Sequence, residues 1–224
     1  MTGQLIFDLP YYPALGSKDF FVSKANSLAF EIIQNWCDWS NRRMIITGVK
    51  GSGKTHLSNV WANLTNASFI KIEELEFDIT NKKAIIIENI NLVASQSDLE
   101  ENLLHILNGC SHTGAFVLMT SSVAPSRVGF GLLDLASRLI STGHIPINPP
   151  DDALLSAVLI KHFTDRQIRI SPFLIEFILK RISRSLTSIA NFANELDETS
   201  LRLGKGPSKA IVTEVLDKIR ENEA

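Results

Sequence analysis

The residues best suited to chemistry form the segment GVKGSGKT, Gly48 to Thr55, which matches the pattern G-x-x-x-x-G-K-[ST] at every fixed position. Glycines let the backbone curl so that its N–H groups face phosphate oxygens, and the N-terminus of the following helix adds a positive dipole end. In this pattern the lysine reaches the terminal phosphates and the last hydroxyl binds Mg²⁺. The spacing therefore predicts a nucleotide site, with contacts from Gly48, Gly51, Ser52, Gly53, Lys54 and Thr55.

A carboxylate for the metal is expected at the end of AIIIENI, residues 84–90. A continuous apolar run that ends in an acid is typical of a buried strand with a carboxylate at its tip, so Glu88 is the candidate Mg²⁺ ligand. A helix-capping or surface acid is the alternative reading. The next residue is Asn89, where nucleotide-hydrolysing proteins of this kind usually have a second acid. An amide cannot take a proton at neutral pH, so we expect slow hydrolysis of the chain's own nucleotide.

The elements that position these residues are predicted by short apolar segments that alternate with helical patterns. Continuous apolarity is typical of parallel strands covered on both faces, and the alternation predicts an α/β layered fold with right-handed crossovers. A glycine, Gly109, is expected to end the third helix. The expected strands are 44–47, 68–72, 84–87, 115–120 and 144–147, and the expected helices are 26–37, 54–64, 97–108 and 131–140.

The pattern becomes entirely helical after Asn148-Pro149-Pro150. Ser171 followed by Pro172 is typical of a helix start, and Gly204 of a helix end. Helices are expected at 153–163, 172–182, 186–203 and 212–220. We therefore expect an N-terminal tail at 1–14, an α/β domain at 15–148 and an all-helical domain at 149–224.

Composition limits the kind of protein that the chain can be. Its 224 residues are 45% hydrophobic and 21% charged, which is typical of a soluble globular protein. No apolar run is long enough to span a bilayer and no signal peptide is evident, so we expect a cytoplasmic protein without a membrane partner. Two cysteines are too few for a disulfide framework or a metal cage. The net charge of −2 gives no general electrostatic case for nucleic-acid binding.

Basic residues do gather at Lys180, Arg181 and Arg184. Such a cluster is more typical of a solvated helix face than of a DNA site, although the sequence leaves DNA contact open. Binding to DNA is therefore expected to be weak or indirect.

Four segments together resemble AAA+ proteins related to the replication initiator DnaA, and most closely the shortened Hda-type (HdaA) branch. The phosphate loop alone is typical of a whole superfamily, whereas QLIFDLP with DLASRL is far more specific. The resemblance implies a P-loop AAA+ core with a five-stranded parallel sheet, followed by a small all-helical lid domain. The segments are QLIFDLP at 4–10, DFFVSKAN at 19–26, the phosphate loop with IIIENI, and NLLHILN through LLDLASRL at 102–139.

QLIFDLP resembles the linear motif with which bacterial proteins dock on the sliding clamp of DNA polymerase. Its position at the N-terminus, before Pro10 and Pro13, favours a free tail, while a strand packed on the core is the alternative. The resemblance assigns clamp binding to Gln4, Leu5, Phe7 and Leu9.

Two further segments resemble family elements that contact a nucleotide. DFFVSKAN resembles the segment that cradles adenine through Phe21 and Val22, while Phe20 and Phe21 are equally consistent with core aromatics. In DLASRL, Arg138 matches the arginine that such proteins present to a nucleotide in a neighbouring subunit, where a fixed positive fork stabilises the transferring phosphoryl group. Without the resemblance, a surface salt bridge would be the preferred reading of Arg138.

Several family features are altered in this chain. Thr187 stands where the lid usually has an arginine, with Arg184 one helical turn earlier. Ser121 and Ser122 replace the more usual acid or amide after the fourth strand. Each change weakens the case for self-sufficient hydrolysis. The chain also ends where DnaA continues into a DNA-binding domain, so we expect a regulator rather than an initiator.

The resemblance implies a negative regulator of replication initiation. Such a protein binds the sliding clamp, holds ADP or ATP with Mg²⁺, ADP being favoured, and stimulates hydrolysis of DnaA-bound ATP through Arg138. Two alternatives remain. One is a self-hydrolysing AAA+ ATPase that loads or remodels replication factors on DNA, and the other is a clamp-bound adaptor with a purely structural nucleotide. Homodimer formation is left open.

Overall fold

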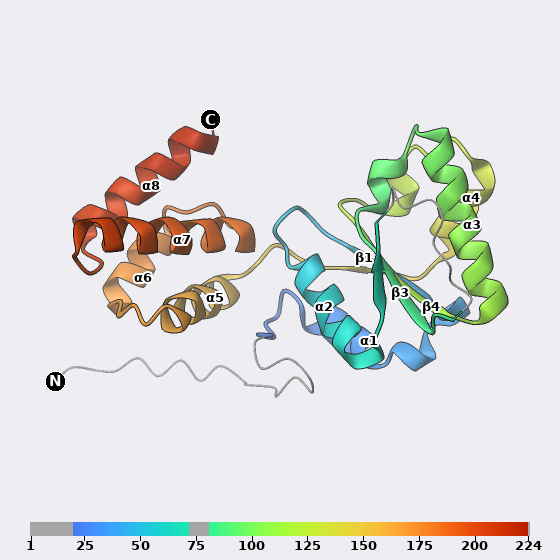
Figure 1. Ribbon diagram of the computed structural model, residues 1–224, viewed down its shortest axis with the longest axis horizontal. Helices are drawn as coiled ribbons and strands as arrows, with labels where there is room; N and C mark the ends of the chain where they lie inside the picture. The colour runs from blue at the N-terminus through green and yellow to red at the C-terminus, as the bar shows by residue number, and fades with distance from the viewer. Residues whose placement is uncertain (1–19, 72–80, 224) are drawn as a thin grey trace. The chain divides into compact units, whose positions relative to one another are not determined.

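The computed structural model describes residues 20–71 and 81–223 (Figure 1). These residues form two compact units. One contains Phe20 and residues 26–149, and we call it the α/β unit. The other contains residues 21–25 and 150–223, and we call it the helical unit.

The described residues of the α/β unit form a five-stranded sheet in the order β2-β3-β4-β1-β5. Every neighbouring pair is parallel, which confirms the predicted fold class. The apolar segments give the strand positions to within one or two residues, and β3 matches its prediction at both ends. The strands are β1 (Arg43–Thr47), β2 (Ser68–Ile70), β3 (Ala84–Ile87), β4 (Phe116–Ser121) and β5 (His144–Pro146).

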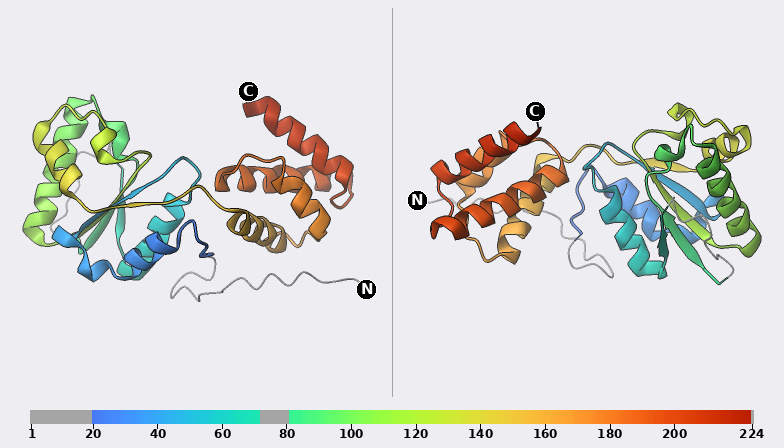
Figure 2. Two further views of the ribbon diagram at one scale, coloured as in Figure 1. Left: turned by 180° about the vertical axis from the view of Figure 1, so that it is seen from behind. Right: turned by 45° about the horizontal axis from the view of Figure 1, so that its top comes forward.

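Helices cover both faces of this sheet, α1 and α2 on one and α3 and α4 on the other (Figure 2). The expected stop of α3 at Gly109 is wrong, because the helix continues for another turn to Thr113. It ends at Gly114, which takes the left-handed conformation with φ 74° that a terminating residue needs. The helices are α1 (Ser27–Gln34), α2 (Lys54–Thr65), α3 (Ser97–Thr113) and α4 (Leu133–Ser141), with 3₁₀ turns η1 (Trp36–Asp38), η2 (Ser40–Arg42), η3 (Ile90–Val93) and η4 (Pro125–Arg127).

The core of the α/β unit explains why its strands are apolar throughout. Ile45 joins the buried cluster with α3 and α4 residues such as Leu107 and Leu139. The next strand residue, Ile46, is also fully buried, although successive strand side chains point to opposite faces. Burying one such side chain stabilises the folded state by about 1.5–3 kcal/mol. A strand that is covered on both faces is therefore most stable when its residues are apolar throughout.

The helical unit contains α5 (Asp152–Asp165), α6 (Pro172–Leu179), α7 (Leu186–Leu203) and α8 (Lys209–Glu223). As expected, Ser171 caps α6 by accepting a hydrogen bond from Leu174 N, and Gly204 ends α7. The predicted extension of α6 to Ile182 is wrong, because the helix ends at Leu179 and residues 180 and 181 form a turn. Ile182 is nevertheless buried in the helical core, so the apolar periodicity continues beyond the helix end.

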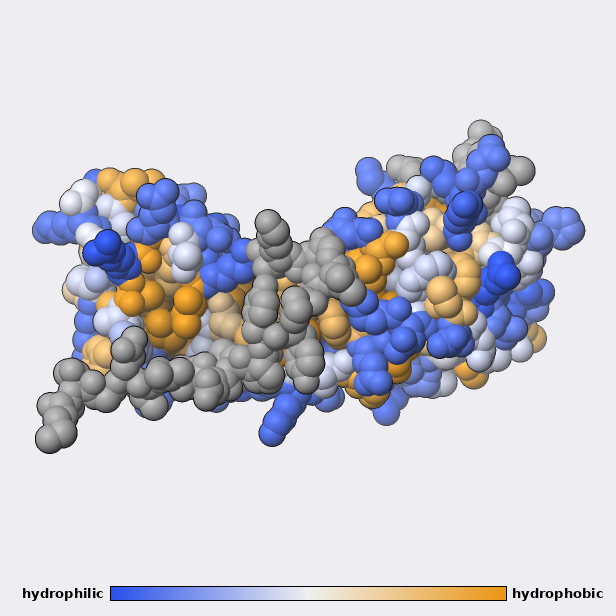
Figure 3. Space-filling view, turned by 90° about the horizontal axis from the view of Figure 1, so that it is seen from below, coloured by the Kyte–Doolittle hydropathy of each residue, from blue (hydrophilic) through white to orange (hydrophobic). Residues whose placement is uncertain are grey.

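Charged and apolar side chains mix on the surface of each unit, and Figure 3 shows exposed apolar groups on one face of both. No helix in the described part of the chain is long and apolar enough to cross a membrane.

Candidate functional site

The phosphate loop joins the end of β1 to the start of α2, and its shape depends on glycine. Gly51 and Gly53 have φ of 77° and 100°, which side chains with a Cβ rarely adopt. At Gly48 a Cβ atom would lie 2.7 Å from Ser52 Oγ and 2.9 Å from the Ile147 carbonyl oxygen. The curled loop that the motif predicts is therefore built from these residues.

Lys54 begins α2, and its side chain turns back into the loop. Its Nζ donates hydrogen bonds to the carbonyl oxygens of Gly48 at 2.7 Å and Val49 at 3.0 Å. Burial lowers the pKa of Lys54, while the charge of nearby Glu88 opposes that change. A buried ammonium group is best compensated by an anion, and the loop offers Lys54 Nζ only two carbonyl oxygens. The loop thus suits a phosphate.

Two buried polar atoms beside Lys54 also suit a bound phosphate or metal. Ser52 Oγ on the loop and Glu88 Oε1 after β3 are buried and form no hydrogen bond with any described residue. Buried polar atoms are nearly always paired, so these two are suited to ligand oxygens or a cation. Because the carboxyl ends of parallel strands meet at one edge, Glu88 lies on the same edge as the loop. Thr55, the second residue of α2 and the other predicted Mg²⁺ ligand, is exposed.

Polar residues beyond Glu88 connect the tips of β3 and β4. Asn89 has φ 57°, and its backbone N–H donates to Thr120 Oγ1 at 2.9 Å. The Oδ1 atom of Asn91 accepts hydrogen bonds from Ser122 N at 2.9 Å and Ser121 Oγ at 3.4 Å. Sequence reasoning missed Thr120 and Asn91, and the available signal was a polar residue within an otherwise apolar strand end. Asn89 remains an exposed amide that cannot accept a proton.

The two aromatic residues of DFFVSKAN have different surroundings. Phe20 is buried in the α/β unit, stacked on Phe30 at 5.2 Å and edge-on to His56 at 5.0 Å between ring centroids. It is therefore a core aromatic. Phe21 and Val22 are half-buried and group with the helical unit.

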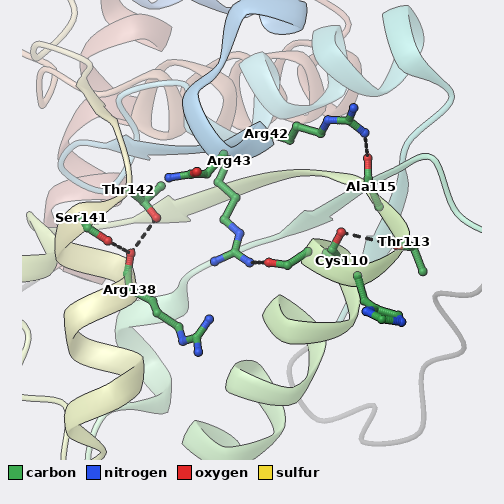
Figure 4. Close-up of a pocket in the computed structure, with 12 residues that line it drawn as sticks. Arg42, Arg43, Cys110, Thr113, Ala115, Arg138, Ser141 and Thr142 are labelled. Carbon is green, nitrogen blue, oxygen red and sulfur yellow. Dashed lines mark hydrogen bonds between the residues drawn. The ribbon is translucent and has the colours of Figure 1, made fainter.

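Arg138 lies on α4, where its Nε forms an ion pair with Asp134 Oδ1 at 3.1 Å. It lines a cavity that Arg43, the first residue of β1, also lines (Figure 4). The phosphate loop follows Thr47, at the other end of β1. Because a strand rises about 3.3 Å per residue, the Cα atoms of Arg43 and Thr47 are about 13 Å apart. The structure therefore does not bring Arg138 to the loop of its own chain.

Arg184, the candidate for the missing lid arginine, is already bound within the helical unit. Its Nη1 pairs with Asp152 Oδ1 at 2.8 Å at the start of α5. Thr187 is exposed on the first turn of α7.

The neighbouring basic residues have contacts of the same local kind. Lys180 pairs with Glu176 at 2.6 Å, and Arg181 lies 3.8 Å above the Phe177 ring. Such contacts are typical of a solvated helix face.

Some candidate residues fall outside the described part of the chain. Gln4, Leu5, Phe7 and Leu9 belong to this group. Within the described ranges, no cluster of His, Cys, Asp and Glu side chains could hold a metal ion by itself. Both cysteines are free, Cys37 exposed and Cys110 buried.

The chain is similar in sequence, at low identity, to DnaA-type replication initiators. No family model matches the chain. It is 24% identical over 216 residues to the chromosomal replication initiator protein DnaA 1 of Chlamydia pneumoniae, covering 82% of this chain and 46% of that protein. The chain thus spans about half the length of the curated relatives it matches.

Solved structures give the same fold. Domain III of the Thermotoga maritima initiation protein DnaA superposes with a TM-score of 0.76 at 17% identity, covering 89% of this chain and 94% of that one. AMPPCP-bound DnaA from Aquifex aeolicus superposes with a TM-score of 0.68 at 14% identity, covering 82% of this chain and 65% of that one. The chain has the AAA+ P-loop fold and is homologous, at low identity, to the AAA+ domain of DnaA-type replication initiators.

Proposed function

We propose that this chain is a nucleotide-holding regulator of replication initiation. It binds the polymerase sliding clamp through Gln4, Leu5, Phe7 and Leu9, and it stimulates hydrolysis of DnaA-bound ATP through Arg138. The homology to DnaA supports a replication role.

The position of Arg138 is the observation that carries this proposal. It lies near the amino end of β1, whereas Lys54 follows the carboxyl end of the same strand. An arginine so far from its own phosphate loop cannot stabilise charge on its own nucleotide, but it is exposed enough to reach another subunit. An arginine supplied in trans stabilises the charge that develops during phosphoryl transfer.

Two apolar side chains of α4 are exposed on a different helix face from Arg138. Leu133 at the start of α4 is 82% exposed, and Ile140 near its end is 54% exposed. They are seven residues apart and so lie on one helix face, whereas Arg138, two residues before Ile140, lies on a nearly opposite face. Their burial against a partner would favour association, but on a face other than the one that presents Arg138.

The chain's own nucleotide has a holding role in this proposal. Lys54, Ser52 and Glu88 suit phosphate and Mg²⁺, as argued above, and AMPPCP-bound DnaA shares the fold. Asn89 supplies no base, and Arg184 is paired with Asp152. These residues favour retention of ADP over turnover of ATP.

A reconstitution with DnaA–ATP, DNA-loaded clamp and the full chain tests the proposal. Arg138→Ala should lower DnaA-ATP hydrolysis by about 10³-fold, the lower range for an arginine supplied in trans. Arg127→Ala, which removes an exposed arginine of η4, is the matched control and should have no effect. Gln4→Ala should weaken clamp binding separately. Equal stimulation by the wild type and Arg138→Ala would refute the arginine's role.

A further inference from the structure

A cavity of about 660 Å³ lies at the amino-terminal edge of the sheet, opposite the phosphate loop. Figure 4 shows Arg43 from β1 and Arg138 from α4 extending into the space between α3 and α4. Arg42 lies on the rim, where its Nη1 donates to the Gly114 carbonyl oxygen at 2.5 Å. No acidic side chain is among the described residues that line the cavity, so its charge is positive.

Arg43 is 7% exposed and has no carboxylate partner among the described residues. Its Nη2 donates to the Leu107 carbonyl oxygen at 2.5 Å and to Ser111 Oγ, both near the end of α3. The negative end of the helix dipole supplies only a partial counter-charge. Cys110 supplies none at neutral pH, because burial raises the pKa of its thiol to about 11. Arg43 stays charged, since burial lowers its pKa from a value far above neutrality.

Arg138 adds a second guanidinium whose charge is also weakly compensated. Its only ion-pair partner in the described part of the chain is Asp134, and both side chains are solvent-exposed, at 37% and 55%. An exposed pair of this kind is worth little. The Arg138 charge also lies close enough to Arg43 to contribute to the lowering of the Arg43 pKa. Two like charges held near one cavity are stabilised by an anion between them.

We propose that this cavity binds the terminal phosphates of a polyphosphate, with Arg43 and Arg138 as its paired ligands. Guanidinium groups bind phosphate oxygens in a bidentate manner, which suits two arginines from different elements. The source of the polyphosphate rests on the proposed function, under which it is the triphosphate held by DnaA. Arg43 is then a second phosphate contact beside Arg138. Free polyphosphate in solution is the other source of the same chemistry.

A purely structural role for Arg43 makes a different prediction. If Arg43 only fastens the end of α3, replacing it will lower stability and leave anion binding unchanged. Anion affinity therefore has to be measured alongside thermal unfolding.

Calorimetric titration of the full chain carrying Lys54→Ala, with sodium tripolyphosphate at low ionic strength, tests the site while the phosphate loop is disabled. We expect saturable binding of one anion per chain. Adding Arg43→Met should weaken it at least tenfold, and adding Arg127→Met, an exposed arginine of η4, should leave it unchanged.

A second pair of variants covers the case in which Arg43→Met does not fold. Ser141 is exposed and lines the cavity, so Ser141→Asp introduces a competing carboxylate there. Ser126→Asp adds the same charge on η4. Tripolyphosphate affinity should fall at least fivefold for Ser141→Asp and be unchanged for Ser126→Asp. Absence of saturable binding, or equal affinity in the two aspartate variants, would overturn the proposal.

Hydrolysis of DnaA-bound ATP separates the two sources. Under the proposed function, Arg43→Met or Ser141→Asp lowers stimulation while clamp binding is retained. If tripolyphosphate binding depends on Arg43 but the wild type does not stimulate hydrolysis of DnaA-bound ATP, the proposed function is refuted. The cavity is then a site for free polyphosphate. Arg138-dependent stimulation without tripolyphosphate binding would sink this inference alone.

Discussion

Glu100→Gln tests how the arginine-bearing helix α4 is held in place. Glu100 is a buried residue of α3 whose Oε1 accepts hydrogen bonds from Ser95 N at 3.0 Å and Gly131 N at 2.9 Å. Its Oε2 accepts one at 2.6 Å from Leu132 N, immediately before α4. Burial by itself opposes ionisation, but the three backbone donors hold the pKa of Glu100 below its ordinary value. The carboxylate therefore ties α3 to the start of α4.

The expected cost follows from these three hydrogen bonds. Glutamine retains one side-chain oxygen, which can still accept from Ser95 and Gly131. Its amide nitrogen then faces the Leu132 N–H, which leaves a buried donor unpaired at a cost of about 1–3 kcal/mol. The two retained bonds lose their charge assistance, which roughly doubles the strength of such bonds. Together these changes should destabilise the α/β unit by about 3 kcal/mol.

Urea unfolding followed by tryptophan fluorescence is the suitable assay, because Trp36, Trp39 and Trp61 are the chain's three tryptophans and all lie in the α/β unit. Glu101→Gln, at the exposed neighbouring position, is the matched control and should have a negligible effect. A loss below about 0.5 kcal/mol for Glu100→Gln, the range of ordinary surface substitutions, would refute the reasoning.

The same comparison has a predicted pH dependence. A group whose folded-state pKa is lowered contributes stability above its unfolded pKa, ordinarily 4.5 for this residue, and loses it as pH falls through the folded-state pKa. The advantage of wild type over Glu100→Gln should therefore be complete at neutral pH and shrink in acid below pH 4.5. A difference that persisted unchanged into strong acid would contradict the assigned charge.

Three further predictions concern the phosphate loop and the cysteines. Lys54→Ala should weaken ADP and ATP binding roughly 100-fold by calorimetry, since a charge-assisted contact to phosphate is lost; an unchanged affinity would contradict the assigned site. Gly48→Ala should destabilise the loop by about 1–3 kcal/mol in urea unfolding and weaken nucleotide binding, because its Cβ would meet Ser52 Oγ and the Ile147 carbonyl. At pH 8, iodoacetamide should modify exposed Cys37 far faster than buried Cys110, whose thiol has a pKa of about 11; mass spectrometry of peptides checks the order, and equal rates would refute it.

Local patterns predict much of the fold, because the signals lie where the elements begin and end. Ser171-Pro172 and Gly204 mark real helix ends, and continuous apolarity marks strands that are covered on both faces. The misplaced end of α3 shows the limit of such signals. Gly109 and Gly114 are both plausible stops, and only the conformation of the chain selects Gly114.

The site residues also differ in whether a local motif or only the folded structure reveals them. Lys54 and Glu88 belong to local motifs, so their positions in the loop and at the strand tip follow from spacing. The pairing of Asn89 with Thr120 joins residues far apart in sequence and is invisible without the fold. From the sequence, Glu100 resembles an ordinary acidic residue on an exposed helix face. In the structure it is a buried carboxylate that accepts hydrogen bonds from three backbone N–H groups.

Arg43 illustrates a charged residue whose role depends on its surroundings. In the sequence, an arginine next to an apolar strand segment is typically exposed to solvent. The ends of α3 and α4 enclose it, and this enclosure turns it into a buried guanidinium beside Arg138.

Under the proposed function, this chain holds one nucleotide and promotes hydrolysis of another. Loading labelled ATP on DnaA in one reaction and on this chain in a second, before both are combined with clamp and DNA, tests it most directly. We expect rapid, Arg138-dependent conversion of the label on DnaA and slow conversion of the label on this chain. Rapid hydrolysis of the label on this chain, unaffected by Arg138→Ala, together with an inert label on DnaA, would contradict the proposed function and favour a self-hydrolysing ATPase.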